Sequence, residues 1–332
     1  MRIVVTGGAG FIGSHFIKYI LKKYPYYKVL NIDKLTYAGN LENLKEVEDN
    51  PNYSFLKEDI CNISAIEDAI DGYDVIINFA AESHVDRSIN SPEVFLKTDV
   101  MGTFNLLEIS RKKGITGYIQ ISTDEVFGSA EEGQIFSESS PLNPSNPYSA
   151  SKAAADLLVL SYYKTYKLPV IIVRSTNNYG PNQYPEKFIP LFITNAIEGK
   201  ELPLYGDGRN VRDWLFVLDN CKAIDIILHK GKEGEVYNVA GGNERENIFI
   251  AKKILEYLGK PESLIKFVKD RPGHDRRYSI SCEKIKKLGW VPEVSLEEGL
   301  RITVEWYKNN QDWWKRIKSG EFLDYYRRHY QL

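Results

Sequence analysis

A tyrosine and a lysine four residues apart form the clearest reactive pair in the chain. Tyr148 and Lys152 occur in Y-S-A-S-K at the start of a helical pattern, and this spacing places both side chains on one helix face. A free tyrosine has a pKa of about 10, and positive charge close to the ring, such as an adjacent ammonium, favours the phenolate. Lowering that pKa to about 7 takes about 4 kcal/mol. A phenolate so formed can remove a proton from an alcohol while hydride leaves the same carbon.

Two consecutive carboxylates, Asp124 and Glu125, follow an apolar run at residues 118–122. If that run is a strand of a parallel sheet, the pair lies at the carboxyl edge, where this architecture binds ligands. Two carboxyl groups with separated pKa values can serve as an acid and a base. We expect both at the site, and the alternative is that one is a solvated loop residue.

A glycine-rich segment, T-G-G-A-G-F-I-G at residues 6–13, follows one predicted strand and opens one predicted helix. Gly8, Gly10 and Gly13 fit G-x-G-x-x-G, and Gly7, Gly10 and Gly13 fit the related G-x-x-G-x-x-G spacing. Glycine is needed where the backbone turns tightly against a pyrophosphate, and a helix N-terminus offers N–H groups to phosphates. The segment therefore predicts a dinucleotide site.

The ends of the next two predicted strands supply the adenosine side of that site. Asp33 lies 20 residues beyond Gly13, where a carboxylate accepts hydrogen bonds from a ribose and favours NAD over NADP. Lys34 beside it weakens this preference. Asp59 and Ile60 follow the third strand and are predicted to lie near the adenine, with an ordinary loop carboxylate as the alternative for Asp59.

The elements that must position these groups alternate along the first half of the chain. Short apolar runs predict strands at residues 2–6, 28–32, 53–57, 75–79, 118–122 and 169–174. Amphipathic stretches between them predict helices, among them 14–23, 100–113 and 149–166. This alternation is typical of a parallel sheet covered on both faces. We expect an α/β, Rossmann-like, doubly wound parallel sheet.

After residue 174 the pattern changes to segments rich in turn formers and charge. These segments are residues 177–186, 202–213 and 270–278, and helical patterns return near 248–258 and 296–307. We predict a smaller C-terminal substrate domain of loops and short helices, packed closely on the first. The tail at 313–330 mixes aromatic and basic residues, which predicts a packed terminal helix, with RNA binding as the alternative.

Composition restricts the class of protein. The 332 residues are 43% hydrophobic and 27% charged, which excludes disordered, collagen-like and coiled-coil chains. The net charge of −2 supplies no basic field for nucleic acid. Three widely spaced cysteines make neither a disulfide framework nor a zinc spacing, so no metal is expected. No apolar run resembles a signal peptide or a membrane helix, and we expect a soluble, cytoplasmic protein.

Eight motifs spread over nearly the whole chain together resemble the extended short-chain dehydrogenase/reductase family, and within it the nucleotide-sugar 4,6-dehydratases. They are TGGAGFIG (6–13), DKLTYAGN (33–40), AAESHVDRSI (80–89), STDEVFG (122–128), YSASK (148–152), NNYGPNQYPEK (177–187), LPLYGDGRNVRDW (202–214) and RPGHDRRY (271–278). The resemblance implies NAD-dependent dehydration of dTDP-glucose to dTDP-4-keto-6-deoxyglucose, on the rhamnose route. Related epimerases lack the Asp124-Glu125 pair and related decarboxylases typically show Ser-Glu there, so the pair favours dehydration.

The resemblance implies a role for each catalytic position. Tyr148 would remove the proton of the glucose C4 hydroxyl, with Lys152 tuning it and Thr123 hydrogen-bonding that oxygen. Hydride would pass from C4 to NAD⁺, and the C4 ketone would acidify the C5 proton. Glu125 would remove that proton while protonated Asp124 donates to the C6 hydroxyl as it leaves as water. The hydride would then return to C6, so NAD should stay bound through turnover.

The resemblance also implies binding residues and an assembly. The implied cofactor contacts are Gly7, Gly10, Phe11, Ile12, Gly13, Asp33, Asp59, Ile60, Ala80, Tyr148, Lys152 and Asn177. The implied substrate contacts are Ser83, His84, Thr123, Asn177, Glu186, Lys187, Pro203, Tyr205, Arg212, Asn247, Arg271 and His274. The implied NAD-binding domain comprises 1–176 and 211–240, and the sugar-nucleotide-binding domain 177–210 and 241–332. Apolar outer faces at 100–113 and 149–166 imply a homodimer.

Three positions depart from the family pattern: Phe127 replaces a tyrosine, Asp99 an asparagine and Asn220 a histidine. Two other readings stay open. A nucleotide-sensing protein without chemistry would be expected to lose Tyr148, Lys152 or the acidic pair. A UDP-glucose 4,6-dehydratase is the closer rival, with an epimerase or decarboxylase less favoured. Thymine and uracil differ by one methyl group, which carries only about 1–3 kcal/mol of discrimination.

Overall fold

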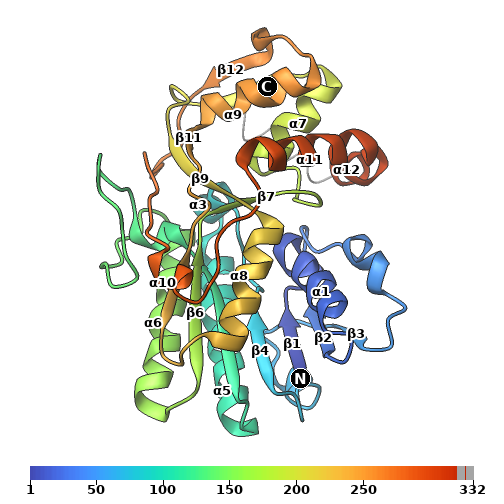
Figure 1. Cartoon of the computed structure of the whole chain (residues 1–332), viewed down its shortest axis with the longest axis vertical. Helices are drawn as coiled ribbons and strands as arrows, with labels where there is room; N and C mark the ends of the chain where they lie inside the picture. The colour runs from blue at the N-terminus through green and yellow to red at the C-terminus, as the bar shows by residue number, and fades with distance from the viewer. Residues whose placement is uncertain (320–325, 327–332) are drawn as a thin grey trace.

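The computed structural model describes residues 1–319 and Tyr326, and its larger body is built on a seven-stranded parallel sheet (Figure 1). The strand order is β10-β6-β5-β4-β1-β2-β3, and every pairing in the sheet is parallel. The strands are β1 (Arg2–Thr6), β2 (Lys28–Asp33), β3 (Tyr53–Lys57), β4 (Val75–Asn78), β5 (Gly117–Thr123), β6 (Val170–Ser175) and β10 (Val236–Val239). The predicted doubly wound α/β fold is confirmed.

Side chains of one strand alternate between two cores, as the pleat of a strand requires. Ile3 and Val5 of β1 pack in a core with α1 (Phe11–Lys23) and α8 (Val217–Lys230). Val4 between them packs in a second core with α5 (Thr103–Lys113) and α6 (Pro147–Tyr166). Because both faces are covered, the strands are mostly apolar, and interior polar residues such as Asn31 and Gln120 are buried. The functional polar groups are found at the carboxyl ends of the strands.

Shorter elements connect these layers on the larger body. They are the 3₁₀ helix η1 (Leu41–Val47), α2 (Ile63–Glu67), α3 (Val85–Asn90), α4 (Pro92–Phe95), the π-helix η2 (Leu96–Gly102), the 3₁₀ helix η3 (Asp124–Phe127) and α10 (Glu283–Lys286). The helix predicted at 100–113 is therefore a π-helical segment followed by an α-helix.

The smaller body stands at the carboxyl edge of the large sheet (Figure 1). Its helices are α7 (Phe188–Glu198), α9 (Asn247–Leu258), α11 (Leu296–Asn309) and α12 (Gln311–Ile317), with the 3₁₀ helix η4 (Glu262–Leu264). Its strands are β7 (Asn177–Tyr179), β8 (Leu202–Tyr205), β9 (Val211–Phe216), β11 (Glu244–Glu246) and β12 (Ile265–Val268). They form a three-stranded sheet, β11-β9-β7, and a two-stranded sheet, β12-β8.

The helices predicted near 248–258 and 296–307 are confirmed as α9 and α11, but the prediction of loops and short helices missed the strands of this body. Its strands are three to six residues long, and its α7, α9 and α11 have 11, 12 and 14 residues. The strands escaped detection because they are short and lie between glycine and proline turns, where an alternating pattern cannot develop. Their pairing partners are remote in sequence: β8 pairs with β12, and β9 with β7 and β11.

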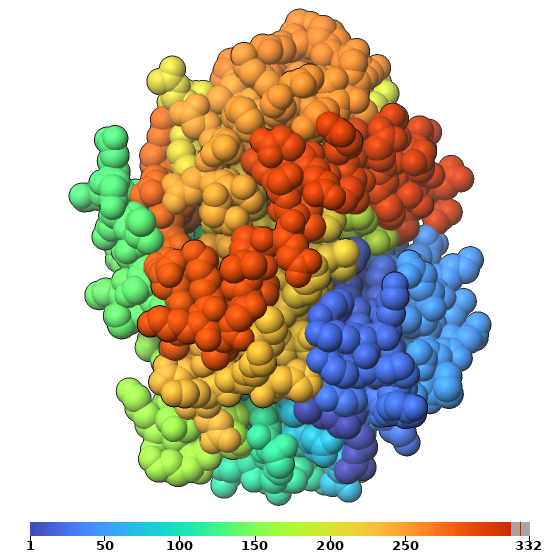
Figure 2. Space-filling model, viewed as in Figure 1, coloured from blue at the N-terminus to red at the C-terminus, as the bar shows by residue number. Residues whose placement is uncertain are grey.

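The domain boundaries implied by the resemblance stay a prediction. Two segments pack on the other body from the one to which these boundaries assign them. β9, within 211–240, belongs to the three-stranded sheet of the smaller body. Ile280, Ile285 and Trp290, within 241–332, pack in the core beneath α1 and α8. Figure 2 shows the orange surface of this later segment on the larger body, below the red surface of α11 and α12.

The tail begins as predicted, because Trp313 and Trp314 of α12 are buried in the core of the smaller body. Most of the remaining tail prediction, at 320–325 and 327–330, lies outside the described residues. Across the part of the chain that the structure describes, no helix combines the length and apolar character needed to span a membrane.

Candidate active site

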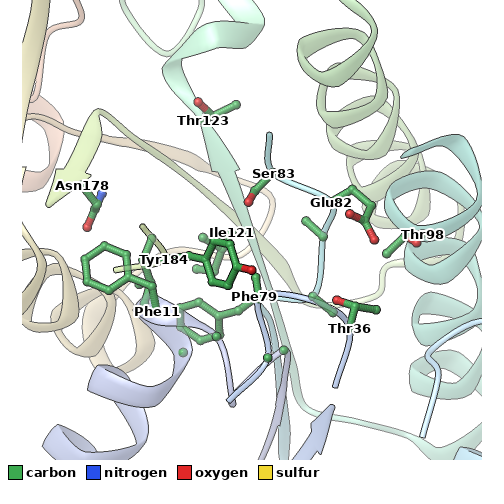
Figure 3. A pocket seen from close by; sticks show the side chains of 18 of the residues that line it. Phe11, Thr36, Phe79, Glu82, Ser83, Thr98, Ile121, Thr123, Asn178 and Tyr184 are labelled. Atoms are coloured by element: carbon green, nitrogen blue, oxygen red, sulfur yellow. The ribbon is translucent and has the colours of Figure 1, made fainter. Parts of the chain in front are cut away.

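Two adjoining cavities occupy the junction between the two bodies. The first, of about 310 Å³, is lined from the ends of β1, β2, β4, β5 and β6 and from the start of α6. In Figure 3, Thr36, Glu82 and Thr98 lie on one side of it, Asn178, Tyr184 and Phe11 on the other, and Thr123 at one end. The second, of about 150 Å³, opens toward the smaller body. Both are lined by Ser83, Glu125, Asn177, Glu186 and Lys187.

The glycine segment forms a close-packed wall of the first cavity. Gly7 has φ +68°, and a Cβ there would lie 2.6 Å from the nitrogen of Ala80. A Cβ on Gly13 would lie 2.6 Å from the Gly7 oxygen. Gly10 is the N-cap of α1, no side chain caps this helix, and its first turn holds no acidic residue. The N–H groups of this turn are therefore available to an anion.

The adenosine side of the cavity is arranged around Asp33. Its two carboxylate oxygens accept from the backbone N–H groups of Ala9 (2.9 Å) and Leu35 (2.8 Å), which orients the group. Each oxygen keeps a second acceptor position for a ribose hydroxyl. The Lys34 ammonium lies 2.7 Å from an Asp59 oxygen, so its charge is balanced locally. Every cofactor contact expected from the sequence lines this one cavity.

The tyrosine–lysine pair lies in the first turns of α6, and both side chains are buried. Lys152 Nζ donates to the Ile121 carbonyl oxygen at 2.7 Å. Burial, and next the Glu125 carboxylate, raise the pKa of Tyr148 well above its usual range. Burial also lowers the pKa of Lys152. These surroundings favour the neutral phenol of Tyr148, so the expected phenolate needs the positive nicotinamide charge in addition to Lys152.

The two consecutive carboxyl groups differ in their surroundings. Burial, and next the Glu125 charge, raise the pKa of Asp124 well above its usual range. Burial also raises the pKa of Glu125, but the nearby cations Arg271, Arg212 and Lys187 oppose that shift. Burial and the neighbouring charge therefore favour the neutral form of Asp124, whereas the nearby cations favour the charged form of Glu125.

Thr123 orders this acidic pair at the end of β5. Its hydroxyl donates to Asp124 Oδ1 at 3.2 Å and accepts from the Glu125 backbone N–H at 3.2 Å. The second Asp124 oxygen, Oδ2, is buried without a hydrogen-bond partner. That oxygen faces no competing donor in the protein, which suits a proton donor waiting for a substrate oxygen.

The second cavity gathers the expected substrate contacts, except Thr123, which lines the first cavity. Two guanidinium groups are fixed there by protein oxygens. Arg212 donates to the Asp275 carbonyl at 2.9 Å and lies 4.0 Å from the centre of the Tyr278 ring. Arg271 Nη1 donates to Asp86 Oδ1 at 3.3 Å, while its Nε is buried without a hydrogen-bond partner. Asn247 Oδ1 is also buried without one, so the cavity offers unsatisfied donors and acceptors to a polar ligand.

Several site residues were missed from the sequence. The Tyr278 hydroxyl donates to Asp275 Oδ2 at 2.8 Å and lies 3.3 Å from Glu125 Oε2. Arg87, which had no expected role, pairs with Glu186. Leu191, Phe192 and Trp214 add an apolar wall to the second cavity. Tyr278 ends a recognised motif and Arg87 lies inside one, but their partners are too distant in sequence to be identified from the motifs.

A Rossmann-type sheet with a buried tyrosine–lysine pair at its carboxyl edge defines a short-chain dehydrogenase/reductase-like protein. More narrowly, the chain belongs to the family described as GDP-mannose 4,6 dehydratase, whose model matches residues 4–303. It is 48% identical to a dTDP-glucose 4,6-dehydratase of Streptomyces niveus, over 97% of each chain.

Solved structures agree with this assignment. The crystal structure of a dTDP-glucose 4,6-dehydratase from Bacillus anthracis in complex with NAD is 53% identical, with a TM-score of 0.90. That of DesIV, a dTDP-glucose 4,6-dehydratase from Streptomyces venezuelae with NAD bound, is 47% identical, with a TM-score of 0.94. Each match covers 96% of this chain and 100% of the other.

Proposed function

We propose that this protein is an NAD-dependent hydro-lyase that converts dTDP-glucose to dTDP-4-keto-6-deoxyglucose. The observation that carries the proposal is the meeting of two functional pairs where the cavities adjoin. Tyr148 and Lys152 are suited to alcohol oxidation, and protonated Asp124 beside Glu125 is suited to the loss of water. Relatives named for this reaction align with the chain over nearly its full length.

The first cavity fits a dinucleotide. Gly7 and Gly13 leave no room for a Cβ, the N-terminus of α1 is uncapped for the pyrophosphate, and Asp33 keeps acceptor positions for a ribose. Phe11, Asp59 and further expected contacts line the same cavity. NAD⁺ bound there would supply a hydride acceptor and the positive charge that the Tyr148 phenolate needs.

Tyr148 and Thr123 act on the substrate C4 hydroxyl. Tyr148 accepts its proton when the hydride leaves C4, and Thr123 holds the same oxygen by hydrogen bonding. Lys152, anchored on the Ile121 carbonyl, stabilises the phenolate by charge. The resulting C4 ketone acidifies the neighbouring C5 proton, which prepares the molecule for elimination.

Glu125 and Asp124 carry out the elimination. Glu125 accepts the C5 proton, and Asp124 gives its proton to the C6 hydroxyl, which departs as water. Glu125 then returns a proton to C5 as the hydride comes back to C6. Oxidation at C4 and reduction at C6 balance, so the reaction consumes no external reductant.

The second cavity would hold the nucleoside diphosphate. Lys187, Arg212 and Arg271 supply positive charge for two phosphates, and a planar guanidinium binds phosphate oxygens in pairs. Pro203 and Tyr205 of β8 line the wall where a pyrimidine would pack. A single thymine methyl contributes about 1–3 kcal/mol in such a pocket.

One experiment tests the reaction and the base together. NAD-loaded protein is incubated with dTDP-glucose or UDP-glucose, and product mass and kcat/KM are measured for each. We expect loss of one water from dTDP-glucose, with a higher kcat/KM than for UDP-glucose. Y148F should abolish product formation while the protein still binds dTDP. A product of unchanged mass would indicate epimerisation and contradict the proposal, and a preference for UDP-glucose would reassign the substrate.

We further propose a homodimer formed through α5, α6 and the preceding η2. Their outer surface exposes five large apolar side chains: Leu96, Met101, Phe104, Leu157 and Tyr166. Large apolar side chains gathered on neighbouring elements favour an interaction site when they form one surface. A cytoplasmic location is part of the same proposal.

A further inference from the structure

Four side chains from three separate segments meet beside the first cavity, and the catalytic steps described above use none of them. Tyr37 lies in the loop after β2, Arg87 lies in α3, and Tyr184 and Glu186 lie in the loop before α7. We call these four residues the clasp. Arg87 and Glu186 are 99 positions apart, so only the tertiary structure brings them together.

The four residues of the clasp are joined by an ion pair, a cation–π contact and an edge-to-face contact between two rings. Arg87 Nε donates to Glu186 Oε2 at 3.0 Å. The Arg87 guanidinium carbon lies 3.8 Å from the centre of the Tyr37 ring, within cation–π range. The Tyr37 and Tyr184 rings meet edge to face, with centroids 5.2 Å apart and planes at 85°. Burial, and next the Glu186 charge, raise the pKa of Tyr37 well above its usual range, so its hydroxyl stays neutral.

The Arg87–Glu186 ion pair is too buried to be explained by a gain in folding stability alone. The Glu186 side chain is only 2% exposed, whereas that of Arg87 is 27% exposed. Removing a carboxylate from water costs free energy that a single ion pair often fails to recover, while losing the partner leaves a buried, uncompensated charge. Such a pair is better explained by a need to hold one particular arrangement of the three segments.

Each of these segments is also a wall of the first cavity. Thr36 and Ala38, on either side of Tyr37, line it, as does Ser83 just before α3. Tyr184 and Glu186 line it directly, and Figure 3 shows Tyr184 projecting across from the side opposite Glu82 and Thr98. The clasp therefore ties opposite walls of the cavity to one another.

We propose that the clasp retains the dinucleotide, and that breaking the Arg87–Glu186 contact is the slow step in NAD release. This inference rests on the proposed function, which places NAD in the first cavity and requires it to remain through turnover. It adds a distinct role for Arg87 and Tyr37, which position the walls and do not act on the substrate.

The loop that carries Tyr184 and Glu186 has a second, independent attachment. A ring nitrogen of His15 in α1 lies 2.9 Å from the Pro181 carbonyl oxygen. Asn182 donates to the Asn43 side chain at 3.2 Å, and Asn43 donates to the Ala9 carbonyl at 3.1 Å. Because these contacts hold the loop to the glycine segment, loss of the clasp should loosen one end of the loop and leave the chain folded.

The test measures NAD release directly. Protein loaded with NAD is diluted into buffer containing an enzyme that consumes free NAD, and the bound fraction is followed with time. R87M, which keeps the stem but loses the guanidinium, should release NAD at least about tenfold faster. R87K keeps the charge without the planar contact, and Y37F keeps the ring but loses the hydrogen bond of the hydroxyl with Glu186. Both should release NAD at intermediate rates.

R316M is the matched control, because Arg316 also pairs with a carboxylate of the larger body, Glu42, at 2.6 Å, but on the exposed surface. Its release rate should equal that of the unmodified protein. The proposed role of the clasp is contradicted if R87M and Y37F both release NAD at the rate of the unmodified protein while keeping its melting temperature. It is also contradicted if R316M accelerates release as much as R87M does. In either case, water loss from dTDP-glucose by the unmodified protein would leave the proposed function standing. Failure of the unmodified protein to bind NAD would overturn both.

Discussion

At the scale of single residues, the environment of Asp124 and Glu125 leads to the sharpest chemical prediction. If Asp124 is the acid and Glu125 the base, as proposed, D124N and E125Q should both spare oxidation at C4 and impair the loss of water. We expect product formation to fall by about 10²–10⁴-fold, the usual contribution of general acid–base catalysis. Near-ultraviolet absorbance of reduced nicotinamide should accumulate in both variants during turnover.

The control for this pair is Y148F, which should show neither reduced nicotinamide nor product, because C4 is never oxidised. Full formation of the 4-keto-6-deoxy product by both carboxyl variants would contradict the assignment of acid and base. Accumulation of reduced cofactor in only one of them would show that a single carboxyl group performs both proton transfers.

A second prediction at this scale concerns His15. Burial, and next the Lys18 charge, lower its pKa from the ordinary 6.5 to about 4. Between these two values the unfolded chain binds a proton that the folded chain does not, so the free energy of unfolding falls as pH falls. The full contribution is about 3 kcal/mol. H15Q should therefore flatten the dependence of the unfolding free energy on pH from about 6.5 down to about 4, measured by urea titration. An unchanged slope would contradict this account.

At the scale of elements, the N-terminus of α6 positions the catalytic tyrosine. The Asn146 side chain accepts from the Ser149 backbone N–H at 2.9 Å, and the Ser149 hydroxyl accepts in return from the Asn146 N–H at 3.2 Å. Loss of such a cap costs about 1 kcal/mol. N146A should lower both the unfolding midpoint and kcat, because Tyr148 lies within the first turn of this helix. N146D, which keeps the acceptor, should recover most of both.

S295A provides a matched control at another helix. The Ser295 hydroxyl caps α11 by accepting from the Glu298 backbone N–H at 3.2 Å, and Ser295 lines neither cavity. A similar loss of stability with unchanged kcat would separate positioning of Tyr148 from general destabilisation. Equal losses of kcat in N146A and S295A would show that the cap of α6 has no specific role in catalysis.

At the scale of the whole molecule, the apolar surface on η2, α5 and α6 predicts the assembly. Leu157 is 60% exposed on α6, and a charge there should disfavour burial against a second copy. L157E should convert a dimeric mass to a monomeric mass in light scattering. I302E, on the exposed face of α11 in the smaller body, should leave the mass unchanged. A monomeric mass for the unmodified protein would contradict the dimer.

The larger body and the cofactor cavity could be predicted closely because their signals are local. Strand and helix periods, the turn at Gly7 and the four-residue spacing of Tyr148 and Lys152 each depend on a few neighbouring residues. Parallel strands then place their carboxyl ends at one edge without further information. The short strands β8 and β9 could not be predicted in the same way, since their pairing depends on partners far along the chain.

The sequence by itself thus determined the family, the nucleotide-binding sheet and the residue types available for acid, base and phosphate binding. Only the tertiary structure decided the pKa shifts and the pairing partners of those residues. The raised pKa of Asp124 follows from its burial and next from the Glu125 charge, while Glu125 faces cations from distant segments. The pairing of Arg87 with Glu186 likewise depends on α3 meeting the loop before α7. Protonation and pairing are set by burial and by charges across space, and a linear pattern does not contain these quantities.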